Sequence, residues 1–294
     1  MKKKYFINNP KVYFIAEIGI NHNGEVKNAL KLIEEAKSAG CDAVKFQKKT
    51  PRISTPKHVW DNPKDTPWGK MTYIEYKERM EFNKKQYKEI IKFCNKLKID
   101  WSASCWDTKS VDFMESLRIP YYKVASASIT DLALLKRIKK TKKPVIISTG
   151  MSTMGQINKA VKILGSKNLG ILHCNSSYPA RYEELNLRFI TKLKKIFPKS
   201  IIGYSGHEKG LSPTVAAAVL DAKIIERHIT LDKAMWGTDQ LASIESMGYA
   251  RIIRDTRIIE KSLGEPKKVV FKSEYEVMKK LMNWMYILKI NHIN

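Results

Sequence analysis

The chain has 294 residues, 43% of them hydrophobic, which is enough for one large core, so we expect a single domain. Its uncharged apolar runs, such as LSPTVAAAVL, are too short to span a bilayer, and no apolar run of signal-peptide length follows the basic N-terminus. Four cysteines without a C-x-x-C pair indicate reduced thiols and a cytoplasmic protein. We therefore expect no membrane association and no disulfides.

A formal net charge of +25 raises the question of nucleic-acid binding, because clustered lysines and arginines release counterions from a phosphate backbone. The lysines are instead spread over many segments with helical periodicity, as is typical of solvated outer faces. We expect no nucleic-acid partner. The positive field would still attract a small anionic substrate.

Short β-branched runs alternate with longer amphipathic segments along the whole chain. Eight of these runs are predicted to be strands, at residues 12–20, 43–47, 100–105, 121–126, 144–149, 169–175, 201–206 and 223–229. The segments between them are long enough to cross back over a parallel sheet. The pattern predicts an α/β protein, a closed (β/α)8 TIM barrel over residues 1–264.

Two segments depart from this repeat. Residues 48–83, with four prolines, form a long insertion after the second strand, either a lid or binding element or a surface insertion without function. Residues 265–294 are too few for a second domain, and we expect them to form a helical tail packed on the barrel.

Polar residues cluster where the predicted strands end, at the face where barrel enzymes keep their chemistry. They are Glu17, Asn21, His22, Lys45, Gln47, Ser104, Lys123, Ser126, Ser128, Ser148, Thr149, Asn175, Ser176, Tyr178, Ser205, His207, Glu226 and His228. Two lysines with several hydroxyls can bind a phosphate and a carboxylate, and two histidines can hold a divalent cation.

Lys45 and Lys123 lie within apolar strands, where an ammonium group needs an anionic partner. One interpretation is a structural ion pair with Glu17 or Glu226. Another is a Schiff base with a carbonyl substrate. We favour an anion clamp, because two lysines occur with hydroxyls close by.

His207 and His228 stand at the ends of the last two strands, in GYSGHE and IERHITLD. Either alone would more often be a core residue than a ligand. Because Glu226 shares a strand face with His228, the pair is a candidate site for a divalent metal with open positions. His22, in NHNG, is interpreted as part of a turn.

The motifs EIGINHNG, VKFQ, YYKVAS, ISTGM, LHCNSSYPA, GYSGHE, ERHITLD and WGTDQLAS, taken in order, resemble the sialic acid synthase (N-acetylneuraminate synthase) family, from about Val12 to Gly264. The resemblance implies metal-dependent condensation of phosphoenolpyruvate with a sugar aldehyde, N-acetylmannosamine-like or a related aldose, to give a nonulosonic or 3-deoxy-2-keto sugar acid and phosphate. It also implies a divalent metal, Mn²⁺ or Mg²⁺, held by His207 and His228, and a homodimer.

The same resemblance assigns different residues to the phosphoenolpyruvate end and to the sugar end of the site. Those expected to bind phosphoenolpyruvate are Lys45, Ser104, Lys123, Ser126, Ser148 and Ser205. Those expected to approach the sugar are Glu17, Tyr178, Glu226 and Asp239, and we count Ser176 among the substrate-binding residues. Glu17, Lys45, Lys123 and Glu226 are expected to be catalytic, with Glu17 or a water on the metal as the base that activates the attacking water.

The chain also departs from the family pattern. Gly206 replaces the aspartate before the first histidine, Ser128 replaces a glutamate, and Ala103–Trp106 replace an S-T-P-F turn. We expect each change to lie near the sugar. The resemblance also implies a C-terminal antifreeze-like domain, which we do not expect in this chain. The alternatives left open are a Schiff-base pyruvate aldolase and a non-catalytic barrel protein.

Overall fold

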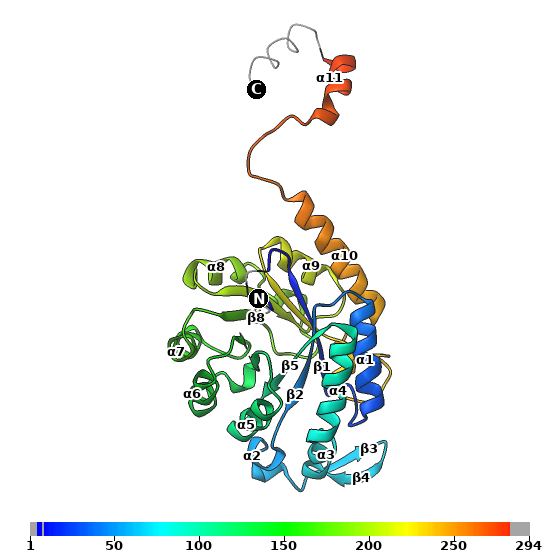
Figure 1. Ribbon diagram of the computed structural model, residues 1–294, viewed down its shortest axis with the longest axis vertical. Coiled ribbons are helices and arrows are strands. Elements are labelled where there is room, and N and C mark those ends of the chain that lie inside the picture. The colour runs from blue at the N-terminus through cyan, green and yellow to red at the C-terminus, as the bar shows by residue number, and fades with distance from the viewer. Residues whose placement is uncertain (1–4, 8, 283–294) are drawn as a thin grey trace. The chain divides into compact units, whose positions relative to one another are not determined.

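The computed structural model describes residues 5–7 and 9–282, and within these a closed barrel of eight parallel strands forms the centre of the protein (Figure 1). The strands follow each other around the barrel in the order β1-β10-β9-β8-β7-β6-β5-β2. Their bounds are β1 Tyr13–Gly19, β2 Ala43–Lys48, β5 Asp100–Cys105, β6 Tyr122–Val124, β7 Val145–Ser148, β8 Leu169–Cys174, β9 Ile201–Gly206 and β10 Ile224–His228. All eight predicted strands, and the (β/α)8 fold, are confirmed.

Helices connect successive strands and cover the outside of the barrel (Figure 1). They are α1 Val26–Ser38, α4 Lys84–Leu97, α5 Thr108–Ser116, α6 Leu132–Lys140, α7 Met154–Leu164, α8 Phe189–Ile196, α9 Ser212–Val219 and α10 Ser246–Ser262. Helix α4 shows why these segments are helical. Its buried residues Tyr87, Ile90 and Cys94 share one face, and Asn83 forms a capping box with Gln86 at its start.

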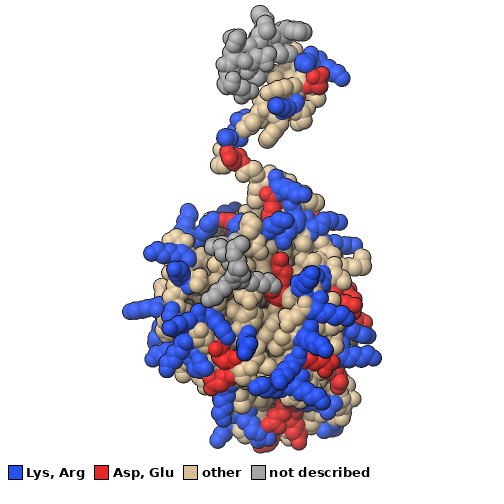
Figure 2. All heavy atoms as spheres, viewed as in Figure 1, with Lys and Arg blue, Asp and Glu red and all other residues tan. Residues whose placement is uncertain are grey.

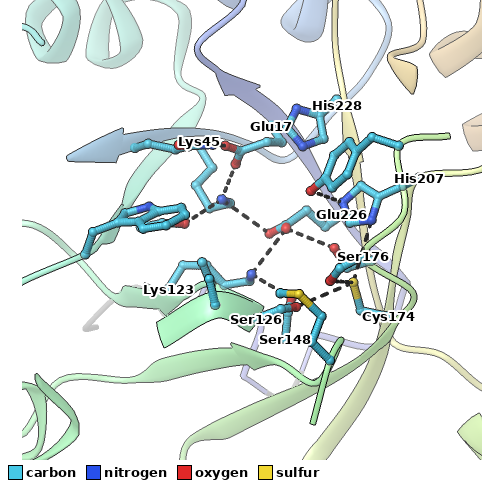
Figure 3. A pocket seen from close by; sticks show the side chains of 18 residues that line it. Glu17, Lys45, Lys123, Ser126, Ser148, Cys174, Ser176, His207, Glu226 and His228 are labelled. Carbon is cyan, nitrogen blue, oxygen red and sulfur yellow. Dashed lines mark hydrogen bonds and ion pairs between the residues drawn. The ribbon is translucent and has the colours of Figure 1, made fainter. Parts of the chain in front are cut away.

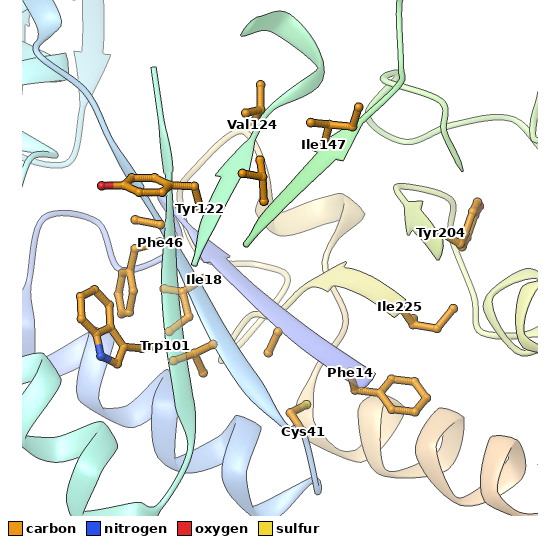
Figure 4. Packing of buried hydrophobic residues seen from close by; sticks show 14 of the residues in the cluster. Phe14, Ile18, Cys41, Phe46, Trp101, Tyr122, Val124, Ile147, Tyr204 and Ile225 are labelled. Carbon is orange, nitrogen blue, oxygen red and sulfur yellow. The ribbon is translucent and has the colours of Figure 1, made fainter. Parts of the chain in front are cut away.

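The strands separate two hydrophobic layers, because successive side chains point to opposite faces. Outward side chains such as Phe14, Tyr204 and Ile225 pack against the helices (Figure 4). Inward ones such as Ile15 and Leu172 fill the barrel toward the amino ends of the strands. The same inward face carries polar side chains toward the carboxyl ends.

The 48–83 segment has secondary structure of its own. It contains α2 Pro51–Ser54, the 3-10 turn η1 Lys57–Val59, the antiparallel pair β3 Pro63–Thr66 and β4 Gly69–Thr72, and α3 Tyr73–Arg79 (Figure 1). Aromatic contacts fix it to the loop after β10. The ring of Trp236 lies 5.6 Å from that of Trp68 and 5.5 Å from that of Tyr76. The insertion is therefore a packed wall of the barrel unit.

The chain divides into two compact units, Met1–Glu260 and Lys261–Asn294. The described part of the second unit contains the turn η5 Lys272–Glu274 and the helix α11 Tyr275–Leu281. Residues 283–294 lie outside the described residues, and packing of the tail on the barrel stays a prediction.

Charged side chains are distributed widely over the barrel unit. Figure 2 shows Lys and Arg spread across the face in view, with acidic side chains among them. No helix within the described residues has the length and apolar character needed to cross a membrane.

Further short 3-10 turns follow individual strands. They are η2 Ser126–Ser128, η3 Tyr182–Glu184 and η4 Gln240–Ala242. Each lies in a connection that leaves the carboxyl end of a strand, so these turns help to place loop side chains at that end of the barrel.

Candidate active site

A cavity of about 160 Å³ opens at the carboxyl ends of the barrel strands (Figure 3). Its lining includes twelve of the thirteen residues predicted for the site: Glu17, Lys45, Ser104, Lys123, Ser126, Ser148, Ser176, Tyr178, Ser205, His207, Glu226 and His228. The thirteenth, Asp239, lies beside the cavity, with Oδ2 3.8 Å from His228 Nδ1. The structure therefore brings the predicted residues together.

The two lysines of the cavity are held by carboxylates and by hydroxyl groups. Lys45 Nζ pairs closely with Glu17, donates to Ser104 Oγ at 2.7 Å, and lies 3.9 Å from Glu226 Oε2. Lys123 Nζ donates to Ser148 Oγ at 2.7 Å and lies 3.3 Å from Glu226 Oε1 (Figure 3). The predicted ion pairs and the predicted lysine–hydroxyl clusters are thus both present.

The two carboxylates experience different electrostatic environments. Burial alone would raise the pKa of Glu226, but Lys123 and Lys45 outweigh it and hold that pKa below its usual value. For Glu17, burial dominates and raises the pKa despite Lys45, with the nearby charge of Glu226 adding to the rise. Glu226 therefore stays ionised, whereas Glu17 can exchange a proton near neutral pH.

Lys123 is fully enclosed by the barrel. Burial lowers its pKa, and the negative charge of Glu226 partly opposes this effect. An ammonium group so placed gains strongly from any anion that enters the cavity, because little water screens the interaction.

His207 is oriented by the loop that follows β8. Its Nδ1 lies 2.6 Å from the backbone oxygen of Asn175, and its Nε2 lies 2.8 Å from the hydroxyl of Tyr178. Because a carbonyl oxygen only accepts, Nδ1 carries a proton, and Nε2 faces the hydroxyl of Tyr178 beside the cavity. Burial alone would lower the pKa of His207, but Cys174 and the backbone oxygen of Asn175 outweigh it and raise that pKa.

His228 presents a ring nitrogen that is not hydrogen-bonded. Its Nδ1 is buried and has no hydrogen-bond partner among the described residues. Burial lowers the pKa of His228, which keeps the imidazole neutral. Space beside it depends on Gly19, which has φ +55°, because a Cβ there would lie 3.3 Å from His228 Nδ1 and 3.1 Å from Glu17 Oε1.

Imidazole nitrogens are the donor type that binds divalent transition metals, and the ring centroids of His207 and His228 lie 5.6 Å apart. The described residues contain no group of three or more His, Cys, Asp and Glu side chains that could hold a metal ion. The donors therefore fit a cation only if substrate or water completes its coordination, as in open catalytic sites.

Five residues line the cavity that the sequence did not indicate: Trp106, Ala125, Ala127, Met151 and Cys174. Cys174 had a detectable signal, because it shares the inward face of β8 with Leu172. Its Sγ lies 3.7 Å from His207 Nδ1. Trp106 and Met151 lie in loops after strands, where no periodic pattern indicates the direction of a side chain.

Gly206 does not lie where the sequence suggested. A Cβ at this position would meet Glu208 Oε2 at 2.5 Å, Tyr204 at 2.6 Å and Arg227 at 2.9 Å, all on the outer face of the barrel. The expectation that this change lies near the sugar is wrong, because the glycine makes room for a buried ion pair between Arg227 and Glu208.

His22 belongs to a turn, as expected. Its Nδ1 accepts a hydrogen bond from the backbone N–H of Gly24 at 3.0 Å, and its ring stacks on Phe82 at a centroid distance of 4.2 Å. It does not line the cavity among the described residues.

The fold and the cavity define a (β/α)8-barrel protein with lysine, serine, carboxylate and histidine side chains converging at the carboxyl ends of its strands. The NeuB family model matches residues 32–268, and the chain belongs to this family.

Curated relatives agree with the family assignment. The chain is 39% identical over 274 residues to N-acetylneuraminate-9-phosphate synthase of Mus musculus, covering 92% of this chain and 76% of the relative. It is 38% identical to N,N'-diacetyllegionaminic acid synthase of Campylobacter jejuni, covering 90% and 81%. A crystal structure of N-acetylneuraminic acid synthetase from Leptospira borgpetersenii in complex with citrate has a TM-score of 0.81 and 30% identity, covering 92% and 91%. The resemblance to sialic acid synthases is confirmed.

Proposed function

We propose that this protein is an enzyme that condenses phosphoenolpyruvate with a sugar aldehyde to give a nonulosonic acid and phosphate. The observation that carries the proposal is the pair of buried lysines, each bonded to a serine hydroxyl at the cavity floor. Family membership and the synthase relatives support the same reaction.

In this proposal, the lysine–serine side of the cavity binds phosphoenolpyruvate. Lys45 with Ser104, and Lys123 with Ser148, supply ammonium and hydroxyl donors for its carboxylate and phosphate. Further hydroxyl groups come from Ser205 on β9, Ser126 in η2 and Ser176 in the loop after β8. Entry of the anions would loosen the present ion pairs of the lysines with Glu17 and Glu226.

The chemistry then requires positioning and proton transfer. C3 of phosphoenolpyruvate attacks the aldehyde carbon, and the aldehyde oxygen takes up a proton to become a hydroxyl. Water adds to C2 and gives up a proton, and phosphate leaves by C–O cleavage. Glu17, with its raised pKa, is the group we assign to proton exchange with this water, while Glu226 keeps Lys45 and Lys123 in place.

We also propose a divalent metal, Mn²⁺ or Mg²⁺, with His207 and His228 as its protein ligands. A cation bound there would polarise the aldehyde oxygen of the sugar. The free Nδ1 of His228 and the inward Nε2 of His207 support this assignment. Tyr178 and Asp239, which adjoin the two histidines, are assigned to the sugar.

The decisive experiment measures phosphate release from phosphoenolpyruvate with a panel of N-acetylated hexosamines and unmodified aldoses. We expect release only when an acceptor sugar and Mn²⁺ are both supplied, and loss of release in excess chelator, restored by added metal. Release that continues undiminished in chelator would contradict the metal. No release with any acceptor would contradict the condensation.

A Schiff-base pyruvate aldolase is the second candidate, because burial lowers the pKa of Lys123 and so favours the nucleophilic amine. Borohydride treatment in the presence of pyruvate separates the two. A trapped adduct on Lys123 favours the aldolase, and its absence together with phosphate release favours the synthase.

The assembly, location and acceptor are also proposals. We propose a homodimer, testable by light scattering, and a cytoplasmic location, supported by four buried, unpaired cysteines. Relatives named for a 9-phosphate product and for N,N'-diacetyllegionaminic acid are almost equally similar, at 39% and 38% identity. Similarity therefore does not choose the acceptor.

A further inference from the structure

A second cavity lies at the opposite end of the barrel from the candidate active site. It measures about 240 Å³ and lies where the loops after α6 and α7 enter β7 and β8. The two helices lie side by side on the outside of the barrel (Figure 1). The lining residues are Lys139, Lys142, Lys143, Val145, Leu164, Gly165, Lys167, Asn168 and Leu169. Four of these nine described residues are lysines, and none of them is acidic.

The helix ends account for one of the four lysines. Lys139, in the last turn of α6, donates from Nζ to the backbone oxygen of Leu164, where α7 ends. A cation there stabilises the unpaired carbonyl groups and the negative end of the helix dipole. Gly165, with φ +81°, makes room for this contact, because a Cβ there would lie 3.0 Å from Lys139 Nζ.

The other three lysines lie in the loops beyond the helices, and one of them has an acidic partner. Lys143 pairs with Glu115 at 2.5 Å. Among the described residues, no Asp or Glu oxygen lies within 4.0 Å of Nζ of Lys142 or Lys167. The partner of Lys139 is a neutral carbonyl group. Three positive charges therefore border the cavity without a described carboxylate to balance them.

These lysines differ in their effect from lysines on open helix faces. Charges on an open face are separated by water, and salt screens them. A cleft that is lined by one sign of charge and has apolar walls focuses the electrostatic field and concentrates counter-ions. Val145, Leu164 and Leu169 supply such walls here. An anion inside the cavity would therefore interact with several ammonium groups at once.

Charge and size together indicate the kind of anion. A single phosphate group carries about −1.5 to −2 charges at pH 7, which is too few to balance three lysines. Pockets for drug-sized ligands usually measure about 300–1,000 Å³, more than the 240 Å³ of this cavity. A compact anion with two linked phosphate groups matches both the charge and the volume.

We propose that this cavity binds a diphosphate group, with Lys142 and Lys167 as its main partners and Lys139 as a third. The site is distinct from the candidate active site, because Val145 begins β7 whereas Ser148, which lines the active-site cavity, ends it. The proposal does not depend on the synthase function.

The first test is calorimetric titration with pyrophosphate at low ionic strength, in excess chelator so that no divalent metal is present. The double variant Lys142→Met/Lys167→Met should bind about tenfold more weakly than the wild type, since each exposed ion pair contributes severalfold in affinity. Methionine is preferred to glycine, because Lys142 has φ +58° and glycine would also change the stability of the turn.

The matched control is Lys31→Met/Lys88→Met, which removes the same charge from exposed lysines on α1 and α4. This variant should bind pyrophosphate as the wild type does. Binding of pyrophosphate to the active-site lysines would be common to all three proteins, so the difference between them isolates the second cavity. Melting temperatures check that the variants are folded.

A second measurement locates the anion in the wild-type protein. Pyrophosphate should slow the acetylation of Lys142 and Lys167, followed by mass spectrometry, and leave the acetylation of Lys31 and Lys88 unchanged. Titration with ADP distinguishes the sources: tighter binding than pyrophosphate indicates a nucleotide, and weaker binding indicates a free diphosphate.

Three results would overturn the proposal. They are equal weakening in the two double variants, equal affinity of the wild type for orthophosphate and pyrophosphate, and acetylation rates that pyrophosphate leaves unchanged. The first would reduce the effect to net charge, the second would remove the preference for two phosphate groups, and the third would place the anion elsewhere.

Discussion

The two faces of β10 carry buried charges that are satisfied in different ways. On the outer face, Arg227 donates from Nη1 to Glu208 Oε1 at 2.8 Å and to Thr214 Oγ1 at 2.5 Å, and from Nη2 to the backbone oxygen of Glu208 at 2.5 Å. Tyr204 donates to the other oxygen of the Glu208 carboxylate at 2.8 Å. Of the side-chain atoms of this cluster, only Arg227 Nε has no partner among the described residues.

On the inner face, Glu226 and His228 leave hydrogen-bonding capacity unused. Glu226 Oε2 and His228 Nδ1 are buried without a hydrogen-bond partner among the described residues. Lys45 is shared between two carboxylates. Buried polar atoms in this state favour the binding of a ligand that satisfies them.

We therefore interpret the outer cluster as a structural ion pair and the inner cluster as a binding site for substrates. Apart from Arg227 Nε, the side-chain atoms of the outer cluster are satisfied within the protein, so we assign this cluster to holding β9 and β10 together behind the two histidines. Glu208 directly follows His207, and Arg227 directly precedes His228. The inner cluster is complete only when anions and a cation enter.

The largest expected effect comes from breaking the outer cluster. Arg227→Met leaves the Glu208 carboxylate buried and unpaired, so the free energy of unfolding should fall by about 3–5 kcal/mol. Urea denaturation measures this loss. Lys223→Met, which removes a surface lysine paired with Asp221, should cost no more than about 1 kcal/mol. A comparable cost in both variants would contradict the structural role of Arg227.

Breaking the inner cluster is expected to have a smaller effect in free energy, and this effect is on catalysis. Lys123→Met should lower kcat/KM for phosphate release by about 10²–10³, or 2.7–4 kcal/mol, because a preorganised cation is lost from the site. Unfolding free energy should fall less than in Arg227→Met, since burial disfavours the Lys123 charge in the empty protein. Unchanged turnover with strongly reduced stability would make Lys123 a structural residue.

The fold and most of the site could be predicted from the sequence because both depend on local periodicity. β-branched runs at regular spacing marked all eight barrel strands. The two-residue period then placed Glu17, Lys45 and Lys123 on the inward face at the carboxyl ends of their strands, where the cavity lies.

The features that the sequence did not predict depend on contacts between residues that are far apart in the sequence or on opposite faces of a strand. The structure of residues 48–83 rests on rings such as Trp68 and Tyr76 meeting Trp236, and no local pattern signals that meeting. Gly206 was placed near the sugar because it precedes His207. Its actual neighbours, Glu208 and Arg227, lie on the opposite face of the strand.

His22 extends the comparison of the outer and inner clusters, because it is a buried polar group that belongs to neither of them. Burial lowers its pKa to about 3. An unfolded chain binds the imidazole proton near pH 6.5, whereas the native state excludes it until about pH 3. Stability attributable to His22 is therefore complete above about pH 6.5 and declines as pH falls below that value, by up to about 1.4 kcal/mol per pH unit.

The measurement is the free energy of unfolding as a function of pH for the wild type and for His22→Phe, which keeps a ring against Phe82 but binds no proton. Other buried histidines titrate in both proteins, so the difference between the two curves isolates His22. The variant should lose stability less steeply between about pH 6.5 and pH 4. Parallel curves would mean that the native state admits the proton, and that the turn at His22 opens readily to water.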